Sequence, residues 1–509
     1  MSIMASAALM FGGCGKENAA PAKDTQASGN DGYLYFSDTQ CPTSLDLAES
    51  WNSWYTVRYG IAETLYKLDD TLTPQPFLAK SCTMEDEYTW KIQLNEGITF
   101  QNGKALTAEA VKLCWERTGE MNPRFNEVLP LESVEADGLT LTVKTTKPTP
   151  AFLNSLCEPL TAVVDADSAD MKNAPVGTGP YKVESYEPQG TTNVARYDGY
   201  WGGTPRLLGA AFQVIADTQA LSMAQQSGDS NVSVSIPAAS LEIFQNDSSY
   251  LVSEAAGSRG QVIFMNYDNE YLQDIAVRRA LSMLVDKEAY ANIINKGASV
   301  PATGLYPDFT AYKADEGYSY DPEGARQVLA DAGYVDSDGD GYVEIDGNQT
   351  PVSLRIATYS TKSELASFCE EMSAQAKNIG IDLSVEVYES VTQQQRTGDF
   401  DLLLVSFAMM PTGDPQYFAD IAFKTGGSSN YGNYSNAEVD ALIEALDVEF
   451  DPQKRIDLAQ QIQEKIIDDA GFIVIGHAKY YYVMDAKVSG LTANPSEYYL
   501  LDKDTAVTE

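Results

Sequence analysis

The pattern of hydrophobic and polar residues changes near the middle of the chain. In the first half, short alternating runs such as YTWKIQL and LTLTVKT predict strands. They flank a helical stretch, TAEAVKLCWERTG, for which Thr107 can serve as the N-cap. Beyond about residue 266, helical runs such as DIAVRRALSMLVDKEAYANIIN alternate with apolar strands such as SLRIATYS and DLLLVSF. This alternation predicts βαβ units and sheet-centred α/β lobes.

The last quarter predicts two consecutive helices and a returning strand. The helices lie in NAEVDALIEALDVEFDPQKRIDLAQQIQEKIIDDAG, and the strand is FIVIGHAKYYYVM. We find no internal repeat and no apolar run long enough to span a bilayer. A chain of 509 residues is too long for one ordinary core, so we expect at least two domains.

Charge narrows the range of partners. The formal net charge is −39, from 34 basic and 73 acidic residues spread along the chain. Such a surface repels phosphate backbones, so nucleic acid is a poor partner. It keeps a protein soluble, and we expect a monomer.

The N-terminus resembles a processed lipoprotein leader. A short apolar run ends in FGGC, which resembles a bacterial lipobox, and a polar linker, residues 15–31, follows it. Cys14 would then be the lipidated first residue of the mature protein. Phe11 stands where leucine is usual, and no positive segment precedes the run, so we expect translation to start upstream of Met1. The alternative is an apolar N-terminus with a free thiol.

Five further cysteines, an odd number, form no CxxC pair. These spacings do not favour zinc, and we expect buried free thiols. The residues are Cys41, Cys82, Cys114, Cys157 and Cys369.

An acidic turn, DSDGDGYVEIDG, begins like an EF-hand loop. Asp336, Asp338 and Asp340 stand at its first, third and fifth positions and precede Gly341. The twelfth position, where an EF-hand needs glutamate, is Gly347, and a predicted strand follows instead of a helix. We therefore expect a solvated connection, with no calcium binding tighter than roughly 10⁻⁴ M.

Six motifs, in order over residues 31–505, resemble the peptide/nickel class of solute-binding proteins of ABC importers, known as family 5 extracellular solute-binding proteins. They are FLAKSCTMEDEYTWKIQLNEGITFQNGKALTAEAVKLCWER, APVGTGPYKVESY, RYDGYWGGTPRL, DIAVRRALSMLVDKEAYANII, YDPEGARQVLADAGY and DFDLLLVSF with TGDPQYF. Family members carry an acidic, glycine-rich turn where DSDGDGYVEIDG stands, which supports a surface connection there.

The resemblance implies an α/β fold with two lobes, like periplasmic binding proteins of the class II type, and an extra subdomain on the first lobe. Two strands would cross the hinge, and closure would bury the ligand between the lobes. The implied boundaries are 1–14 for the leader, 15–31 for the linker, 32–70, 173–266 and 476–509 for lobe I, 71–172 for the subdomain, and 267–475 for lobe II.

The implied function is extracytoplasmic capture of a small peptide or a metal chelate of the nickel type, without a cofactor or a metal site of the protein's own. The partners would be an ABC permease with its ATPase, and the membrane through the lipid anchor. Nickel-type relatives carry a histidine after the DP motif, where this chain has KTGGSSNYGNYSN. One imidazole cannot make a nickel site alone, so the chelator would supply most ligands.

The resemblance also implies ligand-binding residues. Arg124 matches a family arginine that grips ligand carboxylates, a task suited to the planar guanidinium, although a surface ion pair is the alternative. Asp414 stands where dipeptide binders place an aspartate for the ligand ammonium. The full implied set is Tyr55, Arg58, Arg124, Thr412, Asp414, Asn430 and Tyr431.

Other residues have plainer interpretations. The single histidine, His477, is more often a buried structural residue than a ligand in such a strand. Met409 and Met410 favour packing over soft metal ligation. If Arg124 lies outside the site, Arg58 and Arg396 are the next candidates to meet a ligand carboxylate.

Two other functions remain open from the sequence. A surface ligand sensor, or a chemoreceptor partner without transport, could share the fold. An enzyme is disfavoured, because a Ser-His or Cys-His site would depend on His477 and no GxSxG, HExxH or P-loop pattern occurs.

Overall fold

The computed structural model describes residues 32–313, 317–345 and 350–508. Cys14 and Gly347 lie outside these residues. The chain divides into two units, Met1–Asp31 and Gly32–Glu509, and the sheets, lobes and cavity all belong to the second.

One eleven-stranded sheet runs through this unit in the order β17-β16-β18-β12-β19-β11-β1-β10-β9-β8, with β13 beside β19. Its strands are β1 (Tyr33–Asp38), β8 (Tyr181–Tyr186), β9 (Thr192–Arg196), β10 (Gly209–Val214), β11 (Val232–Ser233), β12 (Tyr250–Met265), β13 (Ser299–Pro301), β16 (Ser353–Tyr359), β17 (Asp382–Tyr388), β18 (Leu402–Ala408) and β19 (Phe472–Asp485).

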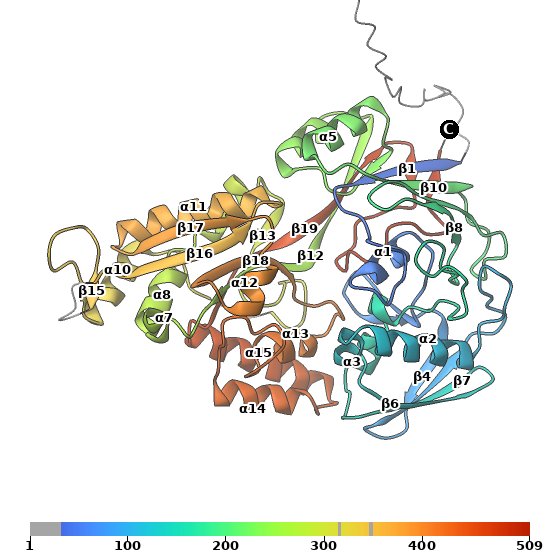
Figure 1. Cartoon of the computed structure of the whole chain (residues 1–509), viewed down its shortest axis with the longest axis horizontal. Helices are drawn as coiled ribbons and strands as arrows, with labels where there is room; N and C mark the ends of the chain where they lie inside the picture. Colours follow the sequence, from blue (N-terminus) through green and yellow to red (C-terminus); the bar gives the residue numbers. More distant parts are fainter. Residues whose placement is uncertain (1–31, 314–316, 346–349, 509) are drawn as a thin grey trace, which may run out of the picture. The chain divides into compact units, whose positions relative to one another are not determined.

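Two long antiparallel strands, β12 and β19, join the two lobes (Figure 1). The first half of β12 pairs with the end of β19, which also holds β11 of lobe I. From Arg259 to Met265, β12 pairs with β18 of lobe II. The pairing of β12 with β19 is irregular between Ala256 and Gly260, where the sheet passes from one lobe to the other. The sheet therefore passes from one lobe to the other inside the strands β12 and β19.

Lobe I is built around β1 and the two strands that pair with it in parallel, β10 and β11. Strands β10 and β11 flank β1, and the apolar faces of Leu34 and Phe36 pack on Phe212 and Tyr59. Its other elements are α1 (Asn52–Arg58), β2 (Tyr66–Leu68), β3 (Pro74–Pro76), α5 (Thr218–Ser227), η2 (Ala238–Ser240), α6 (Leu241–Gln245), β20 (Val488–Ser489) and β21 (Ala506–Val507).

The subdomain contains a separate antiparallel sheet in the order β4-β5-β7-β6. Helix α2 packs on it, and Thr107 accepts a hydrogen bond from the Ala110 N–H, so the predicted N-cap is confirmed. Its elements are β4 (Ala79–Met84), β5 (Thr89–Leu94), α2 (Ala108–Met121), α3 (Arg124–Val128), β6 (Leu131–Asp137), β7 (Thr140–Thr145), α4 (Phe152–Ser155) and η1 (Pro159–Thr161).

Lobe II places helices around the parallel strands β16, β17 and β18. The predicted helix in DIAVRRALSMLVDKEAYANIIN is broken, because Asp286 caps a new start by accepting from the Ala289 N–H. The helices are α7 (Glu270–Gln273), α8 (Ile275–Met283), α9 (Lys287–Ala289), η3 (Tyr290–Ile294), α10 (Pro322–Asp331), α11 (Ser363–Asn378), α12 (Thr392–Thr397), α13 (Gln416–Ala422), α14 (Ala437–Leu446) and α15 (Pro452–Asp468), and β14 (Tyr334–Val335) pairs with β15 (Glu344–Ile345).

The sulfur-containing side chains mostly follow the expectations. Met409 and Met410 are buried in a core shared with the subdomain, as predicted. Five cysteines of the described residues are free: Cys114, Cys157 and Cys369 are buried, whereas Cys41 and Cys82 are only partly buried. Within the same residues, no helix has the length and apolar character needed to cross a membrane.

Candidate ligand-binding cavity

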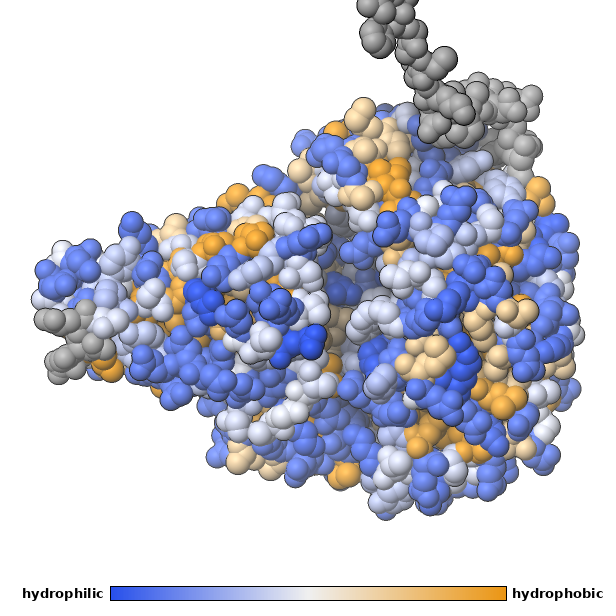
Figure 2. All heavy atoms as spheres, viewed as in Figure 1, coloured by the Kyte–Doolittle hydropathy of each residue, from blue (hydrophilic) through white to orange (hydrophobic). Residues whose placement is uncertain are grey.

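A cavity of about 1060 Å³ lies between the two lobes, and its wall includes residues of the subdomain. Figure 2 shows the surface hollowed there. This is at the upper end of the usual volume of small-molecule sites. Its wall comes from segments within residues 36–59, 124–127, 212–218, 234–239, 294–296, 359–367, 406–431 and 478–482, and from Arg259, Gln395, Glu497 and Leu500.

The cavity wall has the opposite charge balance to the whole chain. Its described residues include six basic side chains and four acidic ones, an excess of two positive charges, in a protein of net charge −39. Field lines concentrate in a cleft between low-dielectric walls, so the cavity favours an anionic ligand. The basic residues are Arg58, Arg124, Arg259, Lys296, Lys362 and Lys479, and the acidic ones are Asp38, Glu127, Glu364 and Glu497.

Arg124, at the start of α3, has spare hydrogen-bonding capacity. Its Nη2 donates to Glu158 Oε1 at 2.9 Å, and its guanidinium lies 4.1 Å from the ring centroid of Trp51. Nε and Nη1 are buried without an acceptor in hydrogen-bonding geometry among the described residues, although the Tyr417 hydroxyl lies beside the guanidinium. Glu158 is fully buried and also accepts from the Trp54 indole. Arg124 therefore forms the ion pair that the sequence offered as the alternative, yet keeps two donors for something else.

A second cationic cluster, Arg58 and Arg259, shares one carboxylate. Arg259 Nη2 lies 2.7 Å from Glu497 Oε1, and Arg58 Nη2 lies 3.4 Å from Oε2. Burial alone would raise the pKa of Glu497, but the charges of Arg259 and Arg58 hold it below the usual value. The ring of Trp54 lies beneath both guanidinium groups, at 5.7 and 5.8 Å. Two guanidinium groups thus share one directly bonded carboxylate, while the charge of Asp38 also acts on Arg58.

Tyrosines complete the wall as neutral hydrogen-bonding groups. Burial raises the pKa of Tyr55 to about 12. Burial also raises the pKa of Tyr417 to about 12, although the positive charge of nearby Arg124 acts to lower it. Both phenols keep their protons near neutral pH, so they can donate to an anionic ligand.

The structure divides the predicted site residues into two groups. Tyr55, Arg58, Arg124 and Tyr431 line the cavity, and the remaining three do not. Thr412 and Asn430 are buried, and the Asn430 amide bonds to the backbone of Lys424 and Tyr434. The exposed Arg396 is also absent from the wall.

Asp414, predicted to meet a ligand ammonium, is buried and paired with an arginine of the protein. Its Oδ1 accepts from Arg455 Nη2 at 2.6 Å and from the Gln416 N–H, and its side chain is only 5% exposed. The negative charge expected for a ligand ammonium is thus already compensated by an arginine of α15. Sequence could not reveal this pair, because 41 residues separate its members.

Several wall residues were missed from the sequence. Arg259 carried a weak signal, as one of only two charged residues, with Glu254, in the strand β12. Glu497 and Trp54 carried none that separates them from ordinary surface or core residues. Lysines 296, 362 and 479 also line the wall, and no motif in the sequence separated them from ordinary surface lysines.

His477 lies in β19, is 2% exposed and is absent from the cavity wall, as expected for a structural histidine. Burial lowers its pKa to about 4. The unfolded imidazole binds a proton below about pH 6.5, so the unfolded state holds more protons between pH 4 and 6.5. The stability that this difference provides is therefore complete above pH 6.5 and is lost as the pH falls toward 4.

Acidification lowers the free energy of unfolding. We predict that this loss is roughly 3 kcal/mol smaller in the His477→Gln variant than in the wild type. Denaturant unfolding at pH 7 and pH 4.5, compared between the two proteins, measures it. The chain has one histidine, so its imidazole ¹⁵N signals titrate without overlap. A folded-state midpoint near pH 6.5 would contradict the prediction.

The fold and the cavity define a two-lobed solute-binding protein, and comparison with known proteins agrees. The family model described as "Bacterial extracellular solute-binding proteins, family 5 Middle" matches residues 73–430. The chain belongs to this family of bacterial extracellular solute-binding proteins. The predicted class, the peptide/nickel class that serves ABC importers, and the predicted fold class are thereby confirmed. The family consists of extracytoplasmic binding proteins, not enzymes.

Three relatives illustrate the range of the family. The nickel-binding protein NikA of Staphylococcus aureus is 27% identical over 99% of this chain and 98% of its own length, and its complex with Ni(L-His)2 superposes with a TM-score of 0.81, covering 93% and 99% of the two chains. A nickel ABC transporter protein of Bacillus halodurans is 30% identical and superposes with a TM-score of 0.78. The match covers 93% of this chain and 100% of the other. The glutathione-binding protein GsiB of Salmonella paratyphi A is 24% identical over 88% of this chain and 90% of its own length.

Proposed function

We propose that this protein captures a small carboxylate-bearing ligand, either a short peptide or a nickel chelate, and delivers it to an ABC permease and its ATPase. The observation that carries the ligand chemistry is Arg124, whose two buried donors lack acceptors in a positively charged cavity. A buried donor without a partner costs about 1–3 kcal/mol, which a ligand carboxylate can recover. The relatives, which bind nickel or glutathione, support both ligand types.

A nickel ion would enter together with its chelator. Nickel favours imidazole and thiolate ligands. The described wall residues include no histidine, and Cys41, their one cysteine, has a thiol whose pKa is raised by burial. Arg124 and the Arg58–Arg259 cluster suit the chelator's carboxylates instead.

Calorimetric titrations with Ni²⁺ alone, with Ni²⁺ plus L-histidine, and with a short-peptide mixture test this ligand chemistry. We expect binding to the chelate or to the peptides, with no comparable binding of Ni²⁺ alone. Tight binding of Ni²⁺ alone would mean that the protein supplies its own metal ligands and would refute the proposal. Loss of that binding in a Cys41→Ser variant would identify the thiol as one of those ligands.

Transport also requires movement and a place at the membrane. We propose that the lobes close on the ligand by bending within β12 and β19, near the irregular pairing at Ala256 and Gly260. We further propose that the monomeric protein acts outside the cytoplasm without catalysis. His477, its one histidine, lies outside the described wall of the cavity, which argues against a Ser-His or Cys-His site there.

We propose that Cys14 carries the lipid anchor, on the basis of FGGC and the polar linker. The wild-type protein, expressed in a bacterial host with a complete leader, should partition into the detergent phase. The Cys14→Ala variant should move to the aqueous phase. Equal aqueous partitioning of both proteins would contradict the anchor without affecting the ligand assignment.

A further inference from the structure

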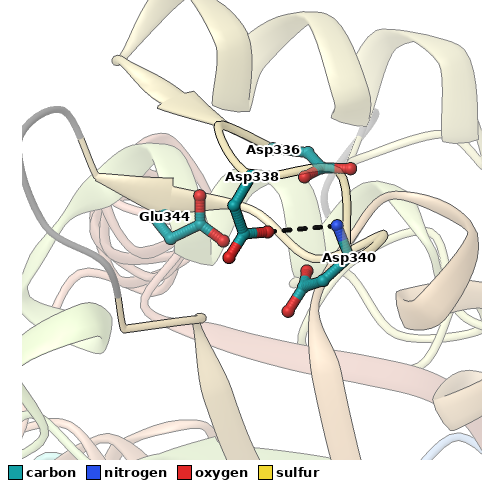
Figure 3. Close-up of side chains that lie close together, drawn as sticks. All are labelled: Asp336, Asp338, Asp340 and Glu344. Atoms are coloured by element: carbon teal, nitrogen blue, oxygen red, sulfur yellow. Dashed lines mark hydrogen bonds between the residues drawn. The ribbon is translucent and has the colours of Figure 1, made fainter.

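The hairpin of β14 and β15 in lobe II carries four carboxylates that converge on one point. Each offers an oxygen, and these oxygens all lie within 4.8 Å of one another. Figure 3 shows the four side chains grouped on one side of the hairpin. We call this group the acidic turn; its members are Asp336, Asp338, Asp340 and Glu344.

The backbone of the acidic turn wraps around its first aspartate. Asp336 accepts from the Gly339 N–H at 2.7 Å and from the Gly341 N–H at 3.0 Å. Both glycines have positive φ angles, 84° and 94°, which L side chains rarely adopt. The carboxylates are therefore held close together by the fold of the loop, at a cost in mutual repulsion.

Glu344 provides an independent indication of a ligand. It is 1% exposed, and its Oε2 accepts from the N–H and the hydroxyl of Ser337. Its Oε1 is buried and has no donor among the described residues. A carboxylate oxygen that is removed from water without a donor is costly, and other carboxylates beside it add repulsion. A cation in the turn would remove both costs.

We propose that the acidic turn binds a hard divalent cation, calcium. The donor set consists of oxygen atoms alone, which suits calcium or magnesium and disfavours softer metals. Calcium accepts six to eight oxygens in flexible geometry, whereas magnesium demands a regular octahedron and retains its waters. Several carboxylates on one short loop fit the first ion better.

The proposal revises the expectation from sequence, which looked for glutamate at the twelfth position of an EF-hand loop. The structure brings in Glu344, the ninth residue counted from Asp336, instead. None of the four residues lines the ligand cavity, so the proposed ion is distinct from any transported metal. The ion would fasten the hairpin that links α10 to β16.

Calorimetry with protein freed of metal by a chelator tests the proposal. We expect one calcium ion per chain, with a Kd of about 10⁻⁴ M or tighter, and much weaker binding of magnesium. Calcium should also raise the melting temperature. The exposed Asp338→Asn change should weaken binding at least tenfold without unfolding the protein, as should Glu344→Gln. Asp331→Asn, an exposed change on nearby α10, is the matched control and should bind like the wild type.

Two results would overturn the proposal. One is the absence of calcium binding up to millimolar concentrations. The other is calcium binding that survives both Asp338→Asn and Glu344→Gln, which would assign it to the general negative charge of the surface. Ligand titrations of the same variants should be unchanged, so failure here leaves the proposed transport function intact.

Discussion

Replacing Arg124 by alanine should weaken ligand binding by roughly 30- to several-thousand-fold, the effect of about 2–5 kcal/mol that follows loss of one partner of a buried charge pair. The reason is that Arg124 lines the cavity and holds two buried donors, Nε and Nη1, without acceptors, and we propose that a ligand carboxylate meets this guanidinium. Arg124→Lys should recover only part of the affinity, because an ammonium lacks the planar array of donors. Calorimetric titration with Ni²⁺ plus L-histidine, and with short peptides, measures the change.

Arg124 also neutralises Glu158, so a single substitution mixes two effects. Leaving Glu158 buried and unpaired should destabilise the protein, whatever happens to the ligand. The double variant Arg124→Met, Glu158→Gln removes both charges and should recover much of the stability without recovering the affinity. The exposed Arg396→Ala serves as the matched control. Wild-type affinity in the double variant would place the carboxylate elsewhere, with the Arg58–Arg259 cluster the next candidate.

Asp414→Ala should lower the free energy of unfolding by about 3–5 kcal/mol, the typical result of breaking a buried ion pair from one side. Arg455, 6% exposed at its side chain, would keep its bonds to the carbonyls of Leu446 and Glu449. It would lose Asp414, 2.6 Å away, the one carboxylate that pairs with it among the described residues. Denaturant and thermal unfolding both measure the loss. Asp70→Ala, at an exposed aspartate, should change stability by less than about 0.5 kcal/mol.

The same variant separates the two roles considered for Asp414. If it anchors Arg455, ligand affinity per folded molecule should remain near that of the wild type. If it bound a ligand ammonium, affinity would fall while stability changed little. The second outcome would restore the interpretation that the sequence motif favoured.

The order of the elements could be predicted because it depends on local patterns. Alternation identified β5 and β7, and the apolar runs identified β16 and β18. The broken helix at Asp286 was missed, although aspartate before a lysine and a glutamate is an ordinary capping signal. Periodicity alone does not show where a capping residue ends one helix and begins another.

The cavity could be predicted only in part, because partners far apart in sequence decide which side chains stay available. Arg124 and Asp414 looked alike from their motifs, as charged residues that could meet a ligand. Arg124 keeps two free donors beside Glu158, whereas Asp414 is neutralised by Arg455. The acidic turn shows the same limit, since Glu344 joins it through the hairpin pairing of β14 and β15, at the ninth position of the loop and not at the twelfth, where an EF-hand places its bidentate glutamate.

Native mass spectrometry of the protein, released from its own cells or exposed to growth medium and gently purified, identifies what the cavity binds. We expect one small carboxylate-bearing molecule per chain, a short peptide or a nickel chelate, which is lost in the Arg124→Met, Glu158→Gln variant and retained in Arg396→Ala. A bound molecule without a carboxylate, or a carboxylate ligand retained equally in all three proteins, would contradict this expectation.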